Sequence, residues 1–371
     1  MAGGVEAGTE SDRERAYWVA FHHVAHVGPA SIRRLQDHFG SLERAWTADG
    51  RKLRAALTER AVAALESTRR ELDVSILMAS LDKQGIEVVT LGDAGYPALL
   101  GEVPSPPPVL FYRGNLVPED DTAVAIVGTR QVTAYGRAMA EQLGAGLAQA
   151  GITVVSGLAR GVDGIAHKAA LDAGGRTIAV LGSGVNWIYP YEHRHLAERI
   201  VGSGAVLSEY APDRKPDAQN FPARNRIISG LSLAVIVVEA PERSGALITV
   251  DFAADQGREV FAVPGPVGAQ KSAGCNKLLR DGARLVRSAE DVLEDLQLDR
   301  KLAEVAVQQA LPLGADEHRV LAVLSSEPRH IDEICELASL STAAAASCLI
   351  TMELQGLIRN AGAQHYVRVG R

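Results

Sequence analysis

Short apolar runs that alternate with amphipathic stretches fill the middle of the chain. From residue 122 onward, segments with helical spacing, such as 136–150 and 162–173, separate the apolar runs. These runs lie at 123–127, 152–155, 177–181, 205–207, 233–238, 259–263 and 283–286. Strands that alternate with helices predict a parallel sheet covered on both faces. We therefore expect an α/β fold with a Rossmann-like parallel-sheet domain at 108–298.

The chain before this domain follows other patterns. Residues 1–15 are polar and acidic and predict a disordered leader. Residues 16–84 have helical spacing around a Val-Gly-Pro turn at 27–29, and resemble a helix-hairpin-helix or sterile-alpha-motif-like module. Such a hairpin can offer backbone N–H groups to a DNA phosphate, and a packing or partner-docking role is equally open. A turn-rich connector is expected at 85–107, and 109–113 predicts a short edge strand.

The chain after the sheet domain has a pattern of its own. A linker is predicted at 299–314, and residues 315–371 predict three helices followed by a β-hairpin, the order found in a winged helix. The predicted recognition helix, which contains no Lys or Arg, starts at residue 341 with the sequence STAAAASCLITMELQG. A helix that enters the major groove normally carries side chains that contact phosphates and bases. We therefore favour a protein-docking or regulatory module over sequence-specific DNA recognition.

Composition narrows the class of protein. The 371 residues carry a net charge of −7, so any nucleic-acid site must be a local positive patch. No run reaches the ~18 apolar residues of a membrane span. Three cysteines far apart predict reduced thiols and a cytoplasmic setting. His22, His23 and His26 suggest a metal site, but no third ligand of suitable spacing stands nearby, and we expect no metal.

Basic and glycine residues gather where the predicted strands end. Ligands of such sheets bind outside the carboxyl ends of the strands. The run Gly128-Thr129-Arg130 follows one strand, and Gly157 and Arg160 follow the next. Lys168 lies one turn into the helix that comes after them. The glycines fit either close approach of a ligand or ordinary tight turns, but the basic residues predict a positive crevice.

The segment at 221–240, FPARNRIISGLSLAVIVVEA, ends in a buried strand and begins with a helix. Pro222 suits a helix start and would place Arg224, Asn225 and Arg226 in the first turn. Arginines are unfavourable there, because the N-terminal end of a helix already carries partial positive charge. Two interpretations stay open. The arginines pair with carboxylates such as Glu209 or Glu239, or they converge with helix N–H groups on a phosphate.

Common cofactor and catalytic patterns are missing or weak. Arg130 occupies the place of the second glycine in a G-x-G-x-x-G fingerprint, and no P-loop lysine motif is present, so we expect neither NAD nor ATP and no cofactor. Asp163 and His167 could be a base and its orienter, although a capping Asp and a structural His fit better. The hydroxyls of Ser244 and Thr249 could cap a helix or hold a phosphate. No nucleophile and base stand at matched positions, so we expect no enzyme.

Several motifs, in order over about 108–290, resemble the bacterial DNA-processing protein A family, DprA or Smf. They read AIVGTRQVTAYG, SGLARGVDGIAHKAAL, TIAVLGSGVNWIYP, SEYAPD, FPARNRIISGLSLAVIVVEA, SGALITVDFAADQGREVFAVPG and GCNKLLRDGA. The chain departs from the usual pattern at Asn186, where the family has Asp, and at Val250, where it has Ala. Neither change removes a charge that DNA binding needs.

The resemblance implies a non-enzymatic recombination mediator that acts in natural transformation or related DNA processing. Such proteins bind single-stranded DNA, load RecA onto it, displace single-strand-binding protein and form homodimers through the Rossmann-like domain, for which about 255–290 is a plausible interface here. The motif positions give Arg130, Lys168, Arg224, Asn225 and Arg226 as DNA contacts. With the crevice residues the predicted site becomes Gly128, Thr129, Arg130, Gly157, Arg160, Lys168, Phe221, Arg224, Asn225 and Arg226.

Three hypotheses about function stay open: a recombination mediator, a hydrolase and a scaffold. Phe221, Tyr189 or Trp187 could stack an unpaired base in the mediator, and core packing under the loop is the alternative for each ring. A nucleoside monophosphate hydrolase on the same type of sheet would need a glutamate in the crevice, for example Glu209 or Glu239. A scaffold whose end modules dock partners would tolerate loss of the crevice charges.

Overall fold

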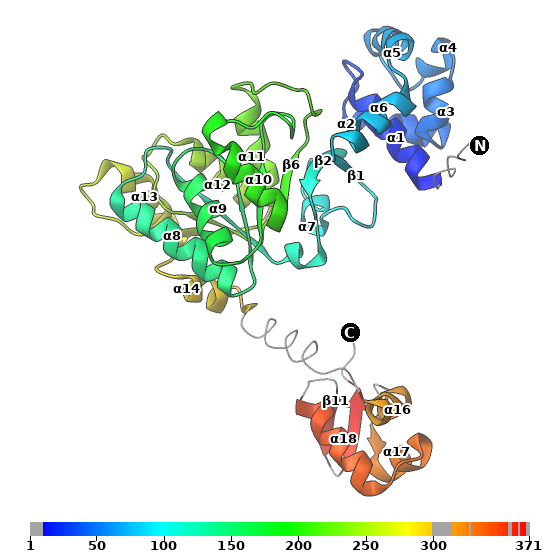
Figure 1. The fold of residues 1–371 in the computed structure, drawn as a ribbon, viewed down its shortest axis with the longest axis vertical. Helices are drawn as coiled ribbons and strands as arrows, with labels where there is room; N and C mark the ends of the chain where they lie inside the picture. The colour runs from blue at the N-terminus through cyan, green and yellow to red at the C-terminus, as the bar shows by residue number, and fades with distance from the viewer. Residues whose placement is uncertain (1–9, 299–313, 326–327, 355–357, 363, 369–371) are drawn as a thin grey trace. The chain divides into compact units, whose positions relative to one another are not determined.

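A computed structural model describes residues 10–298, 314–325, 328–354, 358–362 and 364–368. The chain divides into two compact units, 1–290 and 291–371 (Figure 1). The first unit holds the α/β core and a helical module, and the second holds the C-terminal module.

A nine-stranded sheet forms the centre of the first unit, with the order β1-β2-β6-β5-β4-β3-β7-β8-β9. The seven strands β3 to β9 are parallel, whereas β1 and β2 pair antiparallel at one side. Their bounds are β1 (Glu87–Thr90), β2 (Val109–Gly114), β3 (Ala123–Val127), β4 (Thr153–Ser156), β5 (Thr177–Val180), β6 (Gly204–Ser208), β7 (Ala234–Val237), β8 (Glu259–Ala262) and β9 (Arg284–Leu285). The parallel sheet and its seven predicted strands are confirmed.

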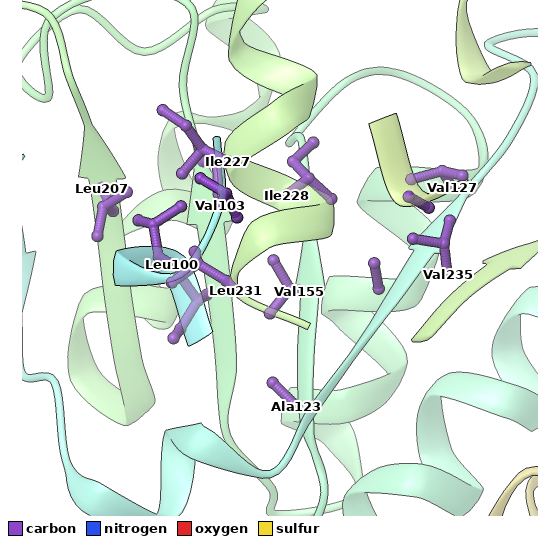
Figure 2. Packing of buried hydrophobic residues seen from close by; sticks show 14 of the residues in the cluster. Leu100, Val103, Ala123, Val127, Val155, Leu207, Ile227, Ile228, Leu231 and Val235 are labelled. Carbon is purple, nitrogen blue, oxygen red and sulfur yellow. The ribbon is translucent and has the colours of Figure 1, made fainter. Parts of the chain in front are cut away.

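Helices cover both faces of the sheet, because side chains of buried strands alternate between the faces. Ile178 and Val180 of β5 pack with Ile227 and Ile228 of one layer, while Ala179 packs with residues of the other. Figure 2 shows part of the first cluster, with Ile227 and Ile228 on the helix and Val155 and Leu207 on the strands. The first layer contains α7 (Ala98–Gly101), α11 (Asn220–Gly230) and α12 (Gly245–Asp255). The other contains the mutually packed helices α8 (Ala134–Gln149), α9 (Val162–Asp172) and α10 (Arg194–Ser203). Beyond α12 come α13 (Ala273–Arg280) and α14 (Ala289–Asp295).

The predicted connector contributes a strand to the sheet. Residues Glu87–Thr90 form β1, which pairs with β2, so β2 lies between β1 and β6 and is not an edge strand. The prediction of an edge position was wrong because β1 is only four residues long, with the sequence EVVT, between turn signals. The sheet therefore begins about twenty residues before the predicted domain boundary.

In the described part of the chain, six helices precede the sheet and form the expected helical module. They are α1 (Glu10–His22), α2 (Pro29–Phe39), α3 (Leu42–Thr47), α4 (Gly50–Leu53), α5 (Glu59–Glu71) and α6 (Val74–Lys83). Because α1 begins at Glu10, residues 10–15 are helical, and their assignment to a leader was wrong; residues 1–9 lie outside the described part. The module shares a core with the sheet, in which Phe21 and Trp46 meet edge-to-face and Phe111 of β2 is fully buried.

The second unit confirms the predicted winged helix. It contains α16 (Ala315–Val323), α17 (Ile331–Ala338) and α18 (Thr342–Leu354), and a sheet of β10 (Arg329–His330), β12 (His365–Arg368) and β11 (Ile358–Gly362) in that order. The predicted linker lies outside the described residues except for Gly314. No single described helix is long and apolar enough to cross a membrane; α17 and α18 pass that test only as a pair, bent by 107°.

Candidate nucleic-acid interface

A pocket lies at the carboxyl ends of the parallel strands, at the point where the strand order reverses. From β3 the chain builds β4, β5 and β6 on one side and then returns to place β7 on the other. Open α/β sheets bind ligands at such a switch point. A pocket of about 770 Å³ lies here, and we call it the crevice. Its walls are the turn after β3, part of α11 and the loop between β7 and α12.

Glycines allow the loops at the strand ends to pack closely against one another. Gly161 has a φ of +77°, and a Cβ there would lie 2.3 Å from the Thr129 carbonyl oxygen. A Cβ on Gly128 would lie 2.6 Å from a methyl group of Val162. The Thr129 N–H donates to the carbonyl of Glu239 over 2.7 Å. These contacts fix the turn that carries Arg130, so the predicted Gly128 and Thr129 have a positioning role.

Arg130 is an exposed cation at the wall of the crevice. Its guanidinium carbon lies 5.8 Å from the centre of the Phe221 ring, within the range of a cation–π contact. The Phe221 ring lies 5.7 Å from that of Tyr189, which is 46% exposed. Within the described residues Arg130 forms no ion pair. The group therefore offers an unneutralised positive charge beside two aromatic faces.

Arg224 lies in the crevice wall but is buried, with 4% of its surface exposed. Helix α11 begins at Asn220, so Arg224 stands in its second turn and not in the first, as predicted. Its Nη1 donates to the carbonyl of Gly157 over 2.8 Å and also to that of Val180. Burial lowers the pKa of Arg224 to about 10, an effect that the nearby Asp163 opposes. Arg224 thus ties together the ends of β4 and β5.

The other two residues of this motif are also engaged. Arg226 forms an ion pair of 2.5 Å with Glu209, so the carboxylate interpretation holds for this arginine. Burial raises the pKa of Glu209, although Arg226 opposes that shift. The Asn225 amide donates to the carbonyl of Gly245 over 3.3 Å, which joins α11 to the start of α12 across the crevice. Asn225 remains part of the crevice wall.

Lys168 and Arg160 do not line the crevice. Lys168 lies in a second pocket, of about 880 Å³, between α8, α9 and α10, and pairs with Asp172 over 2.8 Å. Arg160 pairs over 2.5 Å with Glu192, which lines that second pocket. The hydrogen bond from Arg160 lowers the pKa of Glu192 to about 2. The predicted basic residues are therefore divided between two pockets.

Sequence reasoning missed one basic residue of the crevice. Arg243 is exposed, lines the crevice and precedes Ser244, the N-cap of α12, whose Oγ accepts from the Ala246 N–H. No ion pair of Arg243 occurs within the described ranges. Arg243 stands three residues after the buried run that ends at Ala240. This position could have indicated a crevice residue, because the loop after that strand lies at the switch point.

Glu239 and Glu209, the two glutamates considered for a hydrolase, have other partners. Glu239 accepts hydrogen bonds of 2.8 Å from both the N–H and the hydroxyl of Thr133, at the start of α8. Neither Glu239 nor Glu209 lines the crevice. Asp163 accepts from the Ala159 N–H over 3.3 Å, and buried His167 bonds the Thr177 hydroxyl over 2.7 Å. The structural interpretation of Asp163 and His167 fits these contacts.

Comparison with known proteins assigns the family. The model of the DNA recombination-mediator protein A family matches residues 87–297, and that of its winged-helix domain matches 304–363. The Smf protein of Synechocystis is 35% identical over 96% of this chain and 100% of its own length. The chain belongs to the DNA recombination-mediator protein A family. The family model begins with β1, in agreement with the nine-stranded sheet.

Solved members of the family have the same fold. The DNA processing protein A of Streptococcus pneumoniae is 36% identical and superposes with a TM-score of 0.67, over 75% of this chain and 97% of that one. The DNA processing protein A of Helicobacter pylori is 32% identical, with a TM-score of 0.52, over 57% of this chain and 97% of that one. The structure of the latter was described for its single-stranded DNA binding mode.

Proposed function

We propose that this protein is a non-catalytic recombination mediator that binds single-stranded DNA in the crevice and loads RecA onto it. The observation that carries the proposal is the Arg130 cation, which has no carboxylate partner among the described residues, beside the Phe221 and Tyr189 rings. Unspecific single-strand sites combine positive grooves with aromatic stacking platforms. The family assignment and the single-strand binding of the Helicobacter pylori relative support it.

Phosphates and bases would contact different parts of the crevice. Arg130 and Arg243 lie on the two strand-end loops and can each contact a phosphate of one strand. The N–H groups at the start of α12 add partial positive charge on the same side. A base can stack on Phe221 or Tyr189 only if its face is free. Duplex bases hide their faces in the helix, so this geometry favours single strands.

The protein would act on the strand without changing it chemically. The two glutamates that a hydrolase would use are engaged by Thr133 and Arg226, outside the crevice. Loading of RecA would displace single-strand-binding protein, in natural transformation or a related process in the cytoplasm. We place a homodimer contact at about 255–290, where β9 forms the edge of the sheet. Sedimentation of the full chain tests that contact.

Binding to a labelled oligonucleotide, followed by fluorescence anisotropy over a salt series, tests the crevice. The wild type should prefer the single strand to the duplex of the same length. Arg130→Ala and Arg243→Ala should each flatten the log–log salt slope by ~0.7. The control is Arg70→Ala. Arg70 is an exposed arginine of α5 that lines neither the crevice nor the second pocket, so its removal should leave the slope unchanged. Equal binding of the duplex, or a wild-type slope in both crevice variants, refutes the proposed site.

RecA-dependent ATP hydrolysis on DNA coated with single-strand-binding protein tests the loading step. The wild type should shorten the lag before hydrolysis begins. The Arg130→Ala/Arg243→Ala double variant should leave the lag long, whereas Arg70→Ala should shorten it like the wild type. A wild type that binds single strands and does not shorten the lag would contradict RecA loading while leaving DNA binding intact.

A further inference from the structure

Trp187 is the exposed one of the three tryptophans in this chain. Trp18 and Trp46 lie in the helical core and are each 8% exposed, whereas Trp187 is 42% exposed. The Lys215 Nζ lies 5.5 Å from the centre of its ring. A large indole beside a cation at the surface is not needed for the core. It matches the aromatic and positive components of single-strand binding sites.

Backbone contacts hold this indole in place. The Trp187 N–H donates to the Gly184 carbonyl over 2.9 Å, and its own carbonyl accepts from the Ser183 hydroxyl over 2.7 Å. The Gly184 N–H donates to the Arg214 carbonyl over 2.8 Å, next to Lys215. A Cβ on Gly184 would lie 1.8 Å from the carbonyl oxygen of Pro212, in the loop that carries Lys215, so only glycine allows the two loops to approach so closely. The ring and the cation are thus preorganised together.

The pair adjoins the crevice along the chain. Tyr189, two residues after Trp187, lines the crevice, and so does Pro216, which follows Lys215. Two residues span at most about 7 Å along the backbone. The backbone of Trp187 therefore lies within about 7 Å of that of Tyr189, whose ring meets Phe221. A strand that leaves the crevice on this side would pass beside this part of the loop.

We propose that Trp187 and Lys215 form a second base-stacking subsite for single-stranded DNA. The indole takes the base next to the one held at Tyr189 and Phe221, and Lys215 contacts the phosphate between these two nucleotides. Within the described residues Lys215 has no carboxylate partner, so its charge is available for that contact. This inference rests on the proposed function, because it extends the same strand beyond the crevice.

Intrinsic fluorescence measures this contact directly, because the other two tryptophans are buried. Oligothymidylate should quench the emission of the wild type in parallel with the rise in anisotropy of a labelled strand. Trp187→Phe should abolish the quenching and retain most of the affinity, since phenylalanine still offers an aromatic face. Trp187→Ala should weaken binding by about 5-fold to 150-fold. Lys215→Ala should flatten the salt slope by ~0.7.

The outcomes separate this subsite from the crevice. If the wild type binds the strand and Trp187→Ala binds equally well, or if saturation leaves the emission unchanged, the subsite is refuted and the crevice stands. If quenching persists in Trp187→Phe, the signal comes from the buried tryptophans and the subsite is also refuted. If the wild type binds no single strand at all, both the proposed function and the subsite fail.

Discussion

Replacement of Arg224 separates a role in folding from a role in DNA binding. The family resemblance makes this residue a DNA contact, whereas the structure buries it against the carbonyls of Gly157 and Val180. In Arg224→Leu both carbonyls lose their donor. The buried Asp163 carboxylate also loses the Arg224 charge, which opposes the burial-driven rise of its pKa. We expect the main effect of this substitution to be on stability.

The magnitude follows from the loss of one partner in a buried charged cluster. A hydrogen bond to a charged group contributes about 1.5–3 kcal/mol. Arg224→Leu removes two such bonds, which amounts to about 3–6 kcal/mol. For a unit of this size 1 kcal/mol lowers the transition temperature by about 2 °C, so a decrease of about 6–12 °C is expected. Arg224→Leu/Asp163→Asn should recover part of it.

Scanning calorimetry of the full chain and single-strand anisotropy are measured on the same samples. Arg130→Leu is the matched control, because Arg130 is exposed on the same crevice. It should keep the transition temperature and lose single-strand affinity, the reverse of the pattern for Arg224→Leu at temperatures where that variant is folded. An Arg224→Leu protein with an unchanged transition and a loss of binding equal to that of Arg130→Leu would refute the structural role.

Three further substitutions test other parts of the first unit. Burial lowers the pKa of His167 to about 3, so the folded state keeps it neutral. The unfolded chain protonates this residue below pH 6.5, so its effect on the free energy of unfolding is small above that pH and grows as the pH falls, to a loss of about 2 kcal/mol at pH 5. Urea unfolding at pH 7.5 and pH 5 should show that His167→Gln loses about 2 kcal/mol less unfolding free energy than the wild type between these pH values. Equal losses in both proteins would contradict this. Glu192→Gln frees Arg160 and should raise single-strand affinity and steepen the salt slope by ~0.7 in anisotropy; unchanged binding would mean that Arg160 lies off the path of the strand. Gly184→Ala should force the two loops apart and reduce the quenching of Trp187 fluorescence by oligothymidylate, and wild-type quenching would show that this loop does not position the indole.

The sheet could be predicted from the sequence because its strands are buried on both faces. Runs such as AVAIV at β3 and AVIV at β7 are apolar at every position and carry β-branched residues, so strand and burial follow together. The four residues of β1 lack such a run. Their strand state depends on pairing with β2, which a local pattern does not contain.

The orientation of the site residues was harder to predict than their position in the chain. Arg224 stands three residues before Ile227 and four before Ile228, so all three side chains lie on the buried face of α11. That spacing indicates burial, but a helix start at Pro222 placed the arginine in the first turn. Lys168 lies six residues into α9, about 9 Å along the helix from its start, and so leaves the sheet edge.

The distribution of ion pairs shows how an acidic chain could keep the anion site proposed for the crevice. Arg160, Lys168 and Arg226 each have a carboxylate within 2.8 Å, which neutralises them. Arg130 and Arg243 have none within the described residues, so these two cations of the crevice wall are not neutralised. With two or three free cations on one strand path, the log–log salt slope of one protomer should be only about −1.4 to −2.1. If the proposed site is correct, affinity comes largely from stacking, which a duplex does not offer, and binding of several protomers to one strand would add avidity without new contacts.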